Sequence, residues 1–231
     1  MYFSGTKLTD LSKASIIVIL AGFAAIIAGF YAFAELAEDV LEQEKFAVDQ
    51  AATNFVMSIE APWMGQMWGI ITDLGSVTLI TIASIILFVY LFISSSFSRW
   101  VAIYFAVTMG GIALLTKLLK LLFERSRPEV LAEYDGTGFS FPSGHSTGSI
   151  VFYGFLVYLV IISSMQKKWK WTLNTILTIV FLLVGLSRVY LGVHYFTDVI
   201  AGFSFGLSWL LVCIAGLELT LWNQRRRKGK L

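Results

Sequence analysis

The chain contains two histidines, and the first candidate for chemistry is the one that stands near an aspartate. His194 precedes Asp198 by four residues in the stretch SRVYLGVHYFTD, at 187–198. Residues at i and i+4 lie on one face of a helix, so the carboxylate can hold one ring nitrogen and aim the other outward. A histidine nucleophile or base requires such a partner. His194 and Asp198 are therefore candidate catalytic residues, and the alternative is a buried structural hydrogen bond.

The second histidine belongs to a short polar stretch that opens a long apolar run. It is His145 in PSGHS, at 142–146. Proline, serine and glycine at this place predict a loop that enters a helix N-terminus, where free N–H groups and the helix dipole attract an anion. Ser143 can donate a hydrogen bond or cap the helix, and Gly144 permits close approach of backbone to a ligand. His145 is then a candidate proton donor, and the alternative is an ordinary helix cap with an interfacial histidine.

Three cations complete the candidate anion site. Lys120 and Arg127 are seven residues apart in KLLKLLFERSRP, at 117–128, and this spacing predicts that they share one helical face. Pro128 is expected to end that helix just after Arg127. Arg188 lies six residues before His194, close enough to share the pocket if the chain turns between them at Gly192.

Other polar residues in these stretches have less specific roles. For Lys117 and Arg125 taken alone, the favoured interpretation is that the side chain extends to the headgroup level of a membrane. Further candidates for hydrogen bonds around the site are Lys117, Glu124, Asp135, Tyr190 and Tyr195.

The elements that must position these residues are helices in a membrane. Of the 231 residues, 57% are hydrophobic and 14% are charged, whereas about 25% are charged in an average soluble domain. Each of six apolar runs is long enough to cross about 30 Å of hydrocarbon as a helix. These runs cover residues 14–34, 76–97, 100–123, 146–165, 171–192 and 196–222. We therefore predict an all-α polytopic membrane protein, with a single domain over residues 1–231 and six transmembrane helices.

A helical segment outside the membrane is predicted between the first and second of these spans, at residues 35–75. Its charged first half has helical spacing, and Trp63 and Trp68 suit the headgroup level. The segment is interpreted as a helical hairpin on the membrane surface, with a lid that guides a lipid as the alternative.

The distribution of charge predicts an orientation. With an even number of spans, both termini and two loops lie on one side, and that side carries eleven of the 17 Lys and Arg residues. The positive-inside rule makes this side cytoplasmic, which places the candidate site on the extracytoplasmic side of a plasma membrane. The single cysteine, Cys213, offers neither a disulfide framework nor a cysteine-based metal site. No cluster of carboxylates and histidines remains to bind a catalytic metal, so no cofactor is expected.

The three stretches together resemble the signature of the type 2 phosphatidic acid phosphatase family, K-x6-RP, PSGH and SR-x5-H-x3-D. The chain matches it as Lys120…Arg127-Pro128, Pro142-Ser143-Gly144-His145 and Ser187-Arg188…His194…Asp198, within residues 120–198. The resemblance implies hydrolysis of a phosphate monoester through a phosphohistidine. In that mechanism His194 is the nucleophile that Asp198 orients, and His145 is the general acid. The residues that it implies for phosphate binding are Lys120, Arg127, Ser143, Gly144 and Arg188.

The resemblance also bounds the substrate and the partners. Phosphatidylglycerol phosphate or phosphatidic acid is favoured, and undecaprenyl pyrophosphate is the alternative; neither nucleic acid nor metal is expected. A lipid phosphotransferase would need the same motifs and stays an alternative. A transporter is disfavoured because the polar residues gather at one face. The related haloperoxidases are soluble and larger, which argues against that activity. The oligomeric state stays open, because Gly202 and Gly206 suit either a dimer face or packing within one chain.

Overall fold

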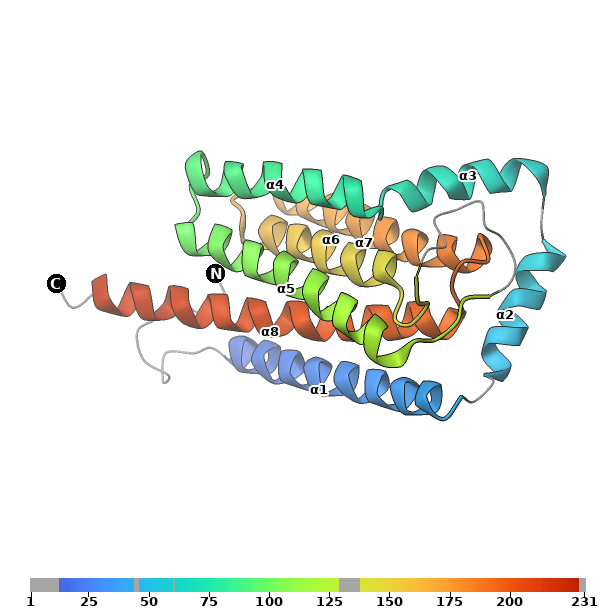
Figure 1. Ribbon diagram of the computed structural model, residues 1–231. Coiled ribbons are helices and arrows are strands. Elements are labelled where there is room, and N and C mark those ends of the chain that lie inside the picture. Colours follow the sequence, from blue (N-terminus) through green and yellow to red (C-terminus); the bar gives the residue numbers. More distant parts are fainter. Residues whose placement is uncertain (1–12, 44–45, 60, 129–137, 229–231) are drawn as a thin grey trace.

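The structure is a computed structural model that describes residues 13–43, 46–59, 61–128 and 138–228. Within these residues it contains eight α-helices and no strand (Figure 1). The helices are α1 (Lys13–Leu41), α2 (Ala47–Ser58), α3 (Pro62–Asp73), α4 (Val77–Ile93), α5 (Arg99–Phe123), α6 (Gly144–Ile162), α7 (Lys167–Tyr190) and α8 (Phe196–Lys228).

Six stretches of these helices are long and apolar enough to cross a membrane, which confirms the predicted all-α architecture with six spans. Two spans differ from the predicted ranges. The first continues to Leu41, and the second is one stretch, Trp63–Ile93, to which both α3 and α4 contribute. The helical outer segment is therefore present as α2 and α3, and a short turn over residues 74–76 connects α3 to α4.

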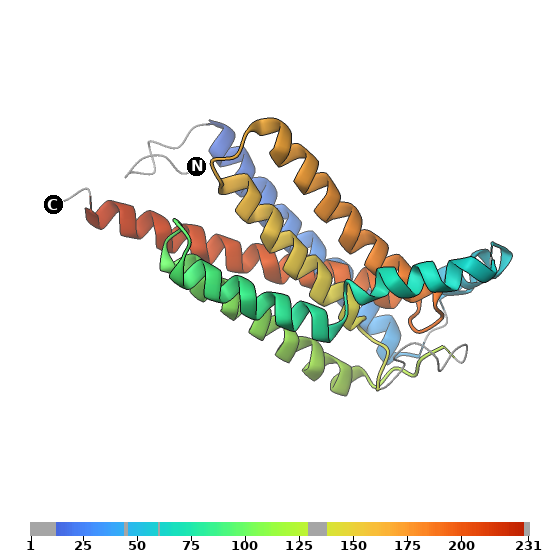
Figure 2. The ribbon, with the colours of Figure 1, turned by 90° about the horizontal axis from the view of Figure 1, so that it is seen from above.

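The helices run up and down, and the loops that precede α6 and α8 lie at the same end of the bundle. α1 begins and α8 ends at the left of Figure 1, whereas α2 lies across the opposite end, beside the loops that precede α6 and α8. Figure 2 shows α6 between α5, α7 and α8, and α6 packs against each of these three helices. The helix that carries PSGH at its start is thus the central helix of the fold.

Close approach of α8 to α6 depends on two glycines. A Cβ at Gly202 would lie 2.9 Å from the carbonyl oxygen of Ser143, and a Cβ at Gly206 would lie 2.6 Å from Cγ2 of Ile150. Contacts this short are sterically forbidden, so only glycine lets the two backbones come together here. Of the two roles that the sequence left open for this glycine pair, the structure shows packing within one chain.

An aromatic cluster supports the loop that precedes α6. Phe141 in this loop is fully buried, and its ring stacks on Phe33 of α1 at a centroid distance of 5.7 Å. Phe123, the last residue of α5, meets Phe141 edge to ring at 5.0 Å. Burial of large rings is the main source of packing energy in such a cluster. The loop therefore has a fixed position relative to α1 and α5.

Candidate active site

Lys120 and Arg127 both reach the polar end of the bundle, but not from one helical face. α5 ends at Phe123, and Glu124 adopts a left-handed conformation with φ of +45° as the C-cap. The predicted end at Pro128 is thus wrong, because the helix already stops at this left-handed residue. Lys120 projects from the last turn of α5, while Arg127 comes from the segment that follows the helix.

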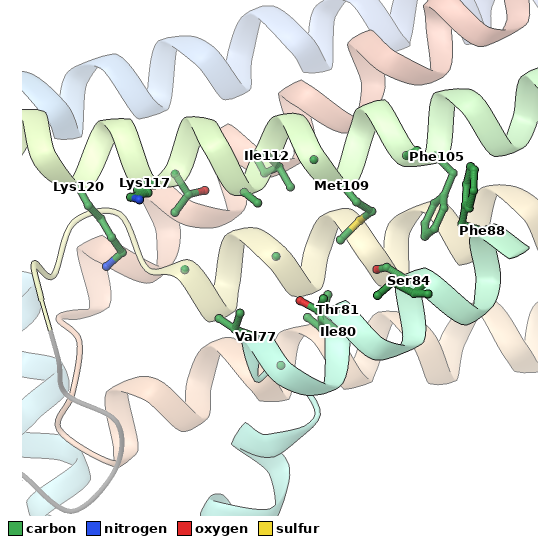
Figure 3. A pocket seen from close by; sticks show the side chains of 18 residues that line it. Val77, Ile80, Thr81, Ser84, Phe88, Phe105, Met109, Ile112, Lys117 and Lys120 are labelled. Carbon is green, nitrogen blue, oxygen red and sulfur yellow. The ribbon is translucent and has the colours of Figure 1, made fainter.

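Lys120 is anchored to the loop before α6. Its Nζ donates to the carbonyl oxygen of Phe139 and, at 3.4 Å, to that of Ser140. In Figure 3 its side chain extends from α5 towards this loop. A Cβ added at Gly144 would lie 3.8 Å from Cε of Lys120, so the first residue of α6 and this ammonium group face one another.

A tight turn brings Arg188 and His194 together, as predicted. Arg188 lies in the last turn of α7, and Gly192 has a φ of +64°, which favours glycine. The N–H groups of Val193 and His194 both donate to the carbonyl oxygen of Arg188, each at 3.2 Å.

The predicted pair of His194 and Asp198 is present, although His194 precedes the helix. α8 begins at Phe196, and Nδ1 of His194 lies 3.4 Å from Oδ2 of Asp198. Ser140 joins the pair: its Oγ donates to the same Oδ2 and lies 3.2 Å from Nδ1. Because Nδ1 is engaged in this way, the opposite ring nitrogen, Nε2, is the one that faces Arg127.

Arg127 lies beside that nitrogen. Its NH1 is 3.4 Å from Nε2 of His194 and also donates to the carbonyl oxygen of Val193 at 3.0 Å. Its Nε donates to the carbonyl oxygen of Gly138 at 2.9 Å. The guanidinium group is thus oriented by two backbone carbonyls beside Nε2 of His194.

The protonation of His194 is set chiefly by burial, because the side chain is only 2% exposed. Burial is the largest cause that lowers the pKa of His194, and together with the charges of Lys120 and Arg127 it brings the pKa to about 4. Asp198 acts in the opposite direction by stabilising the imidazolium. The ring is therefore neutral near pH 7, as a nucleophile must be.

The N-terminus of α6 has the predicted cap. Oγ of Ser143 accepts hydrogen bonds from the N–H of Ser146 at 3.4 Å and from its hydroxyl at 3.0 Å. The hydroxyl proton of Ser143 is then available to an anion. His145, in the first turn of α6, is buried and interacts electrostatically with His194 and with the three cations of the signature. The histidines, the cations and the helix N-terminus thus form one site.

Arg188 and His145 both lie against the end of α3 and the turn that follows it. Arg188 is 1% exposed, and its NH1 donates to Oγ1 of Thr72 at 2.7 Å. A Cβ at Gly75 would lie 3.5 Å from Cδ2 of His145. Neither Thr72 nor Gly75 belongs to the signature, and nothing in their residue types distinguishes them in the sequence.

The interpretation of Arg125 as a residue that only extends to the headgroups is wrong. Its side chain is 14% exposed and lies between two carboxylates, with NH1 2.5 Å from Oδ1 of Asp198 and NH2 3.0 Å from Oδ2 of Asp49. Of the other candidates, the backbone N–H of Tyr195 donates to Asp198, and Tyr190 stacks on Trp68. Asp135 lies outside the described residues, and Lys117 and Glu124 are exposed.

A groove of about 700 Å³ leads away from the phosphate-binding residues between α4, α5 and α6 (Figure 3). Lys117, Lys120 and Gly144 line one end of it, where Lys120 is also bonded to the loop. Its other lining side chains are almost all apolar and include Ile80, Phe88, Phe105, Met109 and Ile112. The site is thus continuous with an apolar channel that follows the length of the helices.

In the part of the chain that the structure describes, no three His, Cys, Asp or Glu residues are grouped so that they could hold a metal ion. The positive charge around His194 comes from Lys120 and Arg127.

A helical bundle with six spans and a histidine pair among cations at one end defines an integral-membrane enzyme of phosphoryl chemistry. The sequence profile of the PAP2 superfamily matches residues 100–220, and the chain belongs to this superfamily.

Comparisons of sequence and of structure with Bacillus subtilis extend the match over most of the chain. Phosphatidylglycerophosphatase B of strain 168 is 32% identical over 185 residues, which cover 78% of this chain and 88% of that protein. The crystal structure of a transmembrane PAP2 type phosphatidylglycerolphosphate phosphatase superposes with a TM-score of 0.75 at 31% identity, covering 84% of this chain and 96% of that one.

A shorter match relates the chain to an undecaprenyl-diphosphatase from Sulfolobus acidocaldarius. It is 35% identical over 115 residues, or 50% of this chain and 51% of that protein. The predicted family and its activity, hydrolysis of phosphate esters of lipids in a membrane, are thereby confirmed.

Proposed function

We propose that the chain removes phosphate from a membrane lipid through a phosphohistidine at His194, on the extracytoplasmic face of the plasma membrane. The observation that carries the proposal is the continuity between the phosphate-binding end, at Lys120 and Gly144, and the apolar groove between α4 and α5. A phosphate bound at that end places the apolar part of its alcohol in the groove. A lipid meets this requirement, whereas a sugar phosphate would leave the groove unfilled.

The first chemical step is attack of Nε2 of His194 on phosphorus. The bond between phosphorus and the alcohol oxygen breaks, and His145 gives its proton to that oxygen. Asp198 and Ser140 hold Nδ1, so the imidazolium that forms is stabilised and cannot rotate.

The second step hydrolyses the phosphohistidine. Water attacks phosphorus, His145 takes a proton from the water, and the bond between Nε2 and phosphorus breaks, which releases phosphate and restores neutral His194. Through both transition states the equatorial oxygens carry negative charge. The groups that stabilise this charge are Lys120, Arg127, Arg188, the hydroxyl of Ser143 and the N–H of Gly144.

For the substrate, phosphatidylglycerol phosphate or phosphatidic acid is favoured, because the relative that aligns with most of this chain is a phosphatidylglycerophosphatase. Undecaprenyl pyrophosphate is the second candidate, on the strength of the shorter match to an undecaprenyl-diphosphatase. Each of these three lipids would place a terminal phosphate at Lys120 and a hydrocarbon chain in the groove.

Phosphate release from a panel of purified lipids tests this proposal, with the protein in detergent. We expect turnover of at least one of the three lipids, little turnover of glucose 6-phosphate, and complete loss in His194→Ala. Near-normal turnover by His194→Ala would contradict the phosphohistidine. A rate of lipid consumption that depends on an added alcohol, without matching release of phosphate, would identify a phosphotransferase in place of a hydrolase.

The orientation is tested by labelling intact cells with a thiol reagent that does not cross membranes. Glu42 and Lys168 are exposed at opposite ends of the bundle, and the native Cys213 is buried. A cysteine that replaces Glu42 should be labelled, and one that replaces Lys168 should not. The reverse pattern would place the active site on the cytoplasmic side.

A further inference from the structure

The outer segment contributes a buried carboxylate to the end of the bundle that holds the active site. Asp49 lies in the first turn of α2 and is 6% exposed. Its Oδ1 accepts a hydrogen bond from the N–H of Thr197 at 2.8 Å, and its Oδ2 accepts one from Oγ1 of the same residue at 2.7 Å. Thr197 is the second residue of α8, so Asp49 caps that helix across 148 residues of sequence.

Arg125 connects this carboxylate to the catalytic one. Its NH2 lies 3.0 Å from Oδ2 of Asp49, while its NH1 lies 2.5 Å from Oδ1 of Asp198 and 2.9 Å from Oγ1 of Thr197. The guanidinium group also packs over the rings of Tyr195 and Phe46, at 4.2 and 5.2 Å from their centroids. A planar guanidinium group held between two carboxylates and two rings has a single orientation.

The two oxygens of Asp198 consequently have separate tasks. Oδ1 is bound to Arg125, and Oδ2 accepts from Ser140 and from the N–H of Tyr195 while it faces Nδ1 of His194. Without Arg125 the carboxylate could rotate about its bond to Cβ. The position of Oδ2, and with it the direction of the His194 ring, therefore depends on Arg125.

Asp49 in turn affects how strongly Arg125 binds Asp198. In a buried cluster with one guanidinium and two carboxylates, each carboxylate takes part of the positive charge. If Asp49 loses its charge, Arg125 is bound more strongly by Asp198 and is no longer held from the other side. Asp198 then moves towards Arg125 and away from His194.

We propose that Asp49 of the outer helix α2 is a positioning residue for the nucleophile, and that it acts through Arg125 and Asp198 on His194. The outer segment is then part of the catalytic apparatus, in contrast to a lid that only admits the lipid. The proposal rests on the proposed role of His194 and Asp198. It goes beyond that role because neither Asp49 nor Arg125 belongs to the signature motifs.

The test is a double-mutant cycle measured as kcat and KM for release of phosphate from phosphatidylglycerol phosphate. Asn at position 49 keeps an oxygen for the N–H of Thr197 but has no charge for Arg125. We expect Asp49→Asn to lower kcat by about tenfold, the lower end of what loss of an outer hydrogen-bonding partner of a functional histidine costs. KM should change less than twofold, because Asp49 does not contact the substrate groove.

The cycle separates positioning from a structural role. If Asp49 acts through Asp198, Asp49→Asn should cause no further loss of kcat in a protein that already carries Asp198→Asn. Additive losses, or a wild-type kcat in Asp49→Asn alone, would overturn the proposal. Glu42→Gln is the matched control: this exposed carboxylate lies just before α2, and its neutralisation should leave kcat unchanged.

Two further measurements keep the outcome decisive. If Asp49→Asn does not fold, the same cycle is run with Thr197→Val, which removes one hydroxyl that contacts both Asp49 and Arg125 and leaves every charge in place. His194→Ala is assayed in parallel. Normal turnover by His194→Ala would refute the proposed mechanism, whereas an inactive His194→Ala combined with an additive cycle would refute only the role of Asp49.

Discussion

The groups around His194 have opposing effects on its pKa. Burial and the nearby cations Lys120 and Arg127 disfavour the imidazolium, while Asp198 favours it. From the sequence alone, the carboxylate would be expected to raise the pKa of His194. The structure gives the opposite net direction, because the ring is buried, and the pKa falls to about 4. The spacing of His194 and Asp198 in the sequence does not show that the ring is buried. The net direction of the pKa shift is therefore known only from the fold.

This balance predicts the pH dependence of catalysis. The nucleophile must be neutral, so kcat/KM should fall on the acid side as His194 gains a proton, with a midpoint near pH 4. Asp198→Asn removes the group that stabilises the imidazolium, and the pKa of His194 should fall further. The acid limb should therefore move to lower pH while the maximum rate drops.

Profiles of kcat/KM against pH for the two proteins check this prediction, with a substrate whose own ionisation is subtracted. An acid limb that moves to higher pH in Asp198→Asn, or does not move, would show that Asp198 does not stabilise the imidazolium of His194.

The signature residues were predictable from the sequence because histidine, cations and a helix start are rare together in an apolar chain. Ser140, Thr72 and Asp49 were not predictable, since each is an ordinary polar residue whose role is a contact with a distant segment. Asp49 and Thr197, for example, meet across 148 residues. Arg125 was misread for the same reason: both of its carboxylate partners come from other elements.

At the scale of elements, the spans were predictable because the length of an apolar run is set by the thickness of the bilayer. The ends of helices were less predictable, because they depend on local conformation. α5 stops at a left-handed Glu124, four residues before the proline that was expected to end it. The consequence is functional, since Arg127 can approach Nε2 of His194 only from a segment that has left the helix.

The contact between α6 and α8 sets the distance between the two halves of the site, and at Gly202 α8 meets the backbone at the start of α6. A methyl group there would meet the carbonyl oxygen of Ser143 at 2.9 Å and Oγ1 of Thr147 at 3.0 Å. Gly202→Ala should therefore separate the start of α6 from α8, at a cost of about 1–3 kcal/mol in the free energy of unfolding. Activity should fall as well, because Ser143 and Asp198 lie on opposite sides of this contact.

Thermal unfolding in detergent and phosphate release measure these two effects. Gly22→Ala is the matched control, because a Cβ at Gly22 has no atom within 4 Å and alanine favours a helix. Equal behaviour of the two variants would mean that α6 and α8 can move apart without consequence for the site.

At the scale of the whole molecule, the bundle brings three cations and two histidines from different helices and loops to one end. The signature residues gather at one end, the central helix α6 begins at that end, and the apolar groove opens from the same place. Lys120, Arg127 and Arg188 can then supply the charge that a divalent ion supplies in other phosphatases. Each of the three is held by an oxygen of another segment, so this charge is already in place before the substrate arrives.

If Lys120, Arg127 and Arg188 supply this charge, EDTA should leave phosphate release nearly intact, whereas vanadate should inhibit it. Vanadate can adopt a trigonal-bipyramidal geometry like that of the transferring phosphoryl group, with Nε2 of His194 as an axial ligand and the three cations around its equatorial oxygens. Because this geometry needs the nucleophile, binding of vanadate to His194→Ala should be much weaker when followed by its protection against thermal unfolding. Phosphate release that is lost in EDTA and restored by Mg²⁺ would show that the three cations do not suffice to stabilise the phosphoryl group. If vanadate protected His194→Ala as well as the wild-type protein, the anion would bind elsewhere in the bundle.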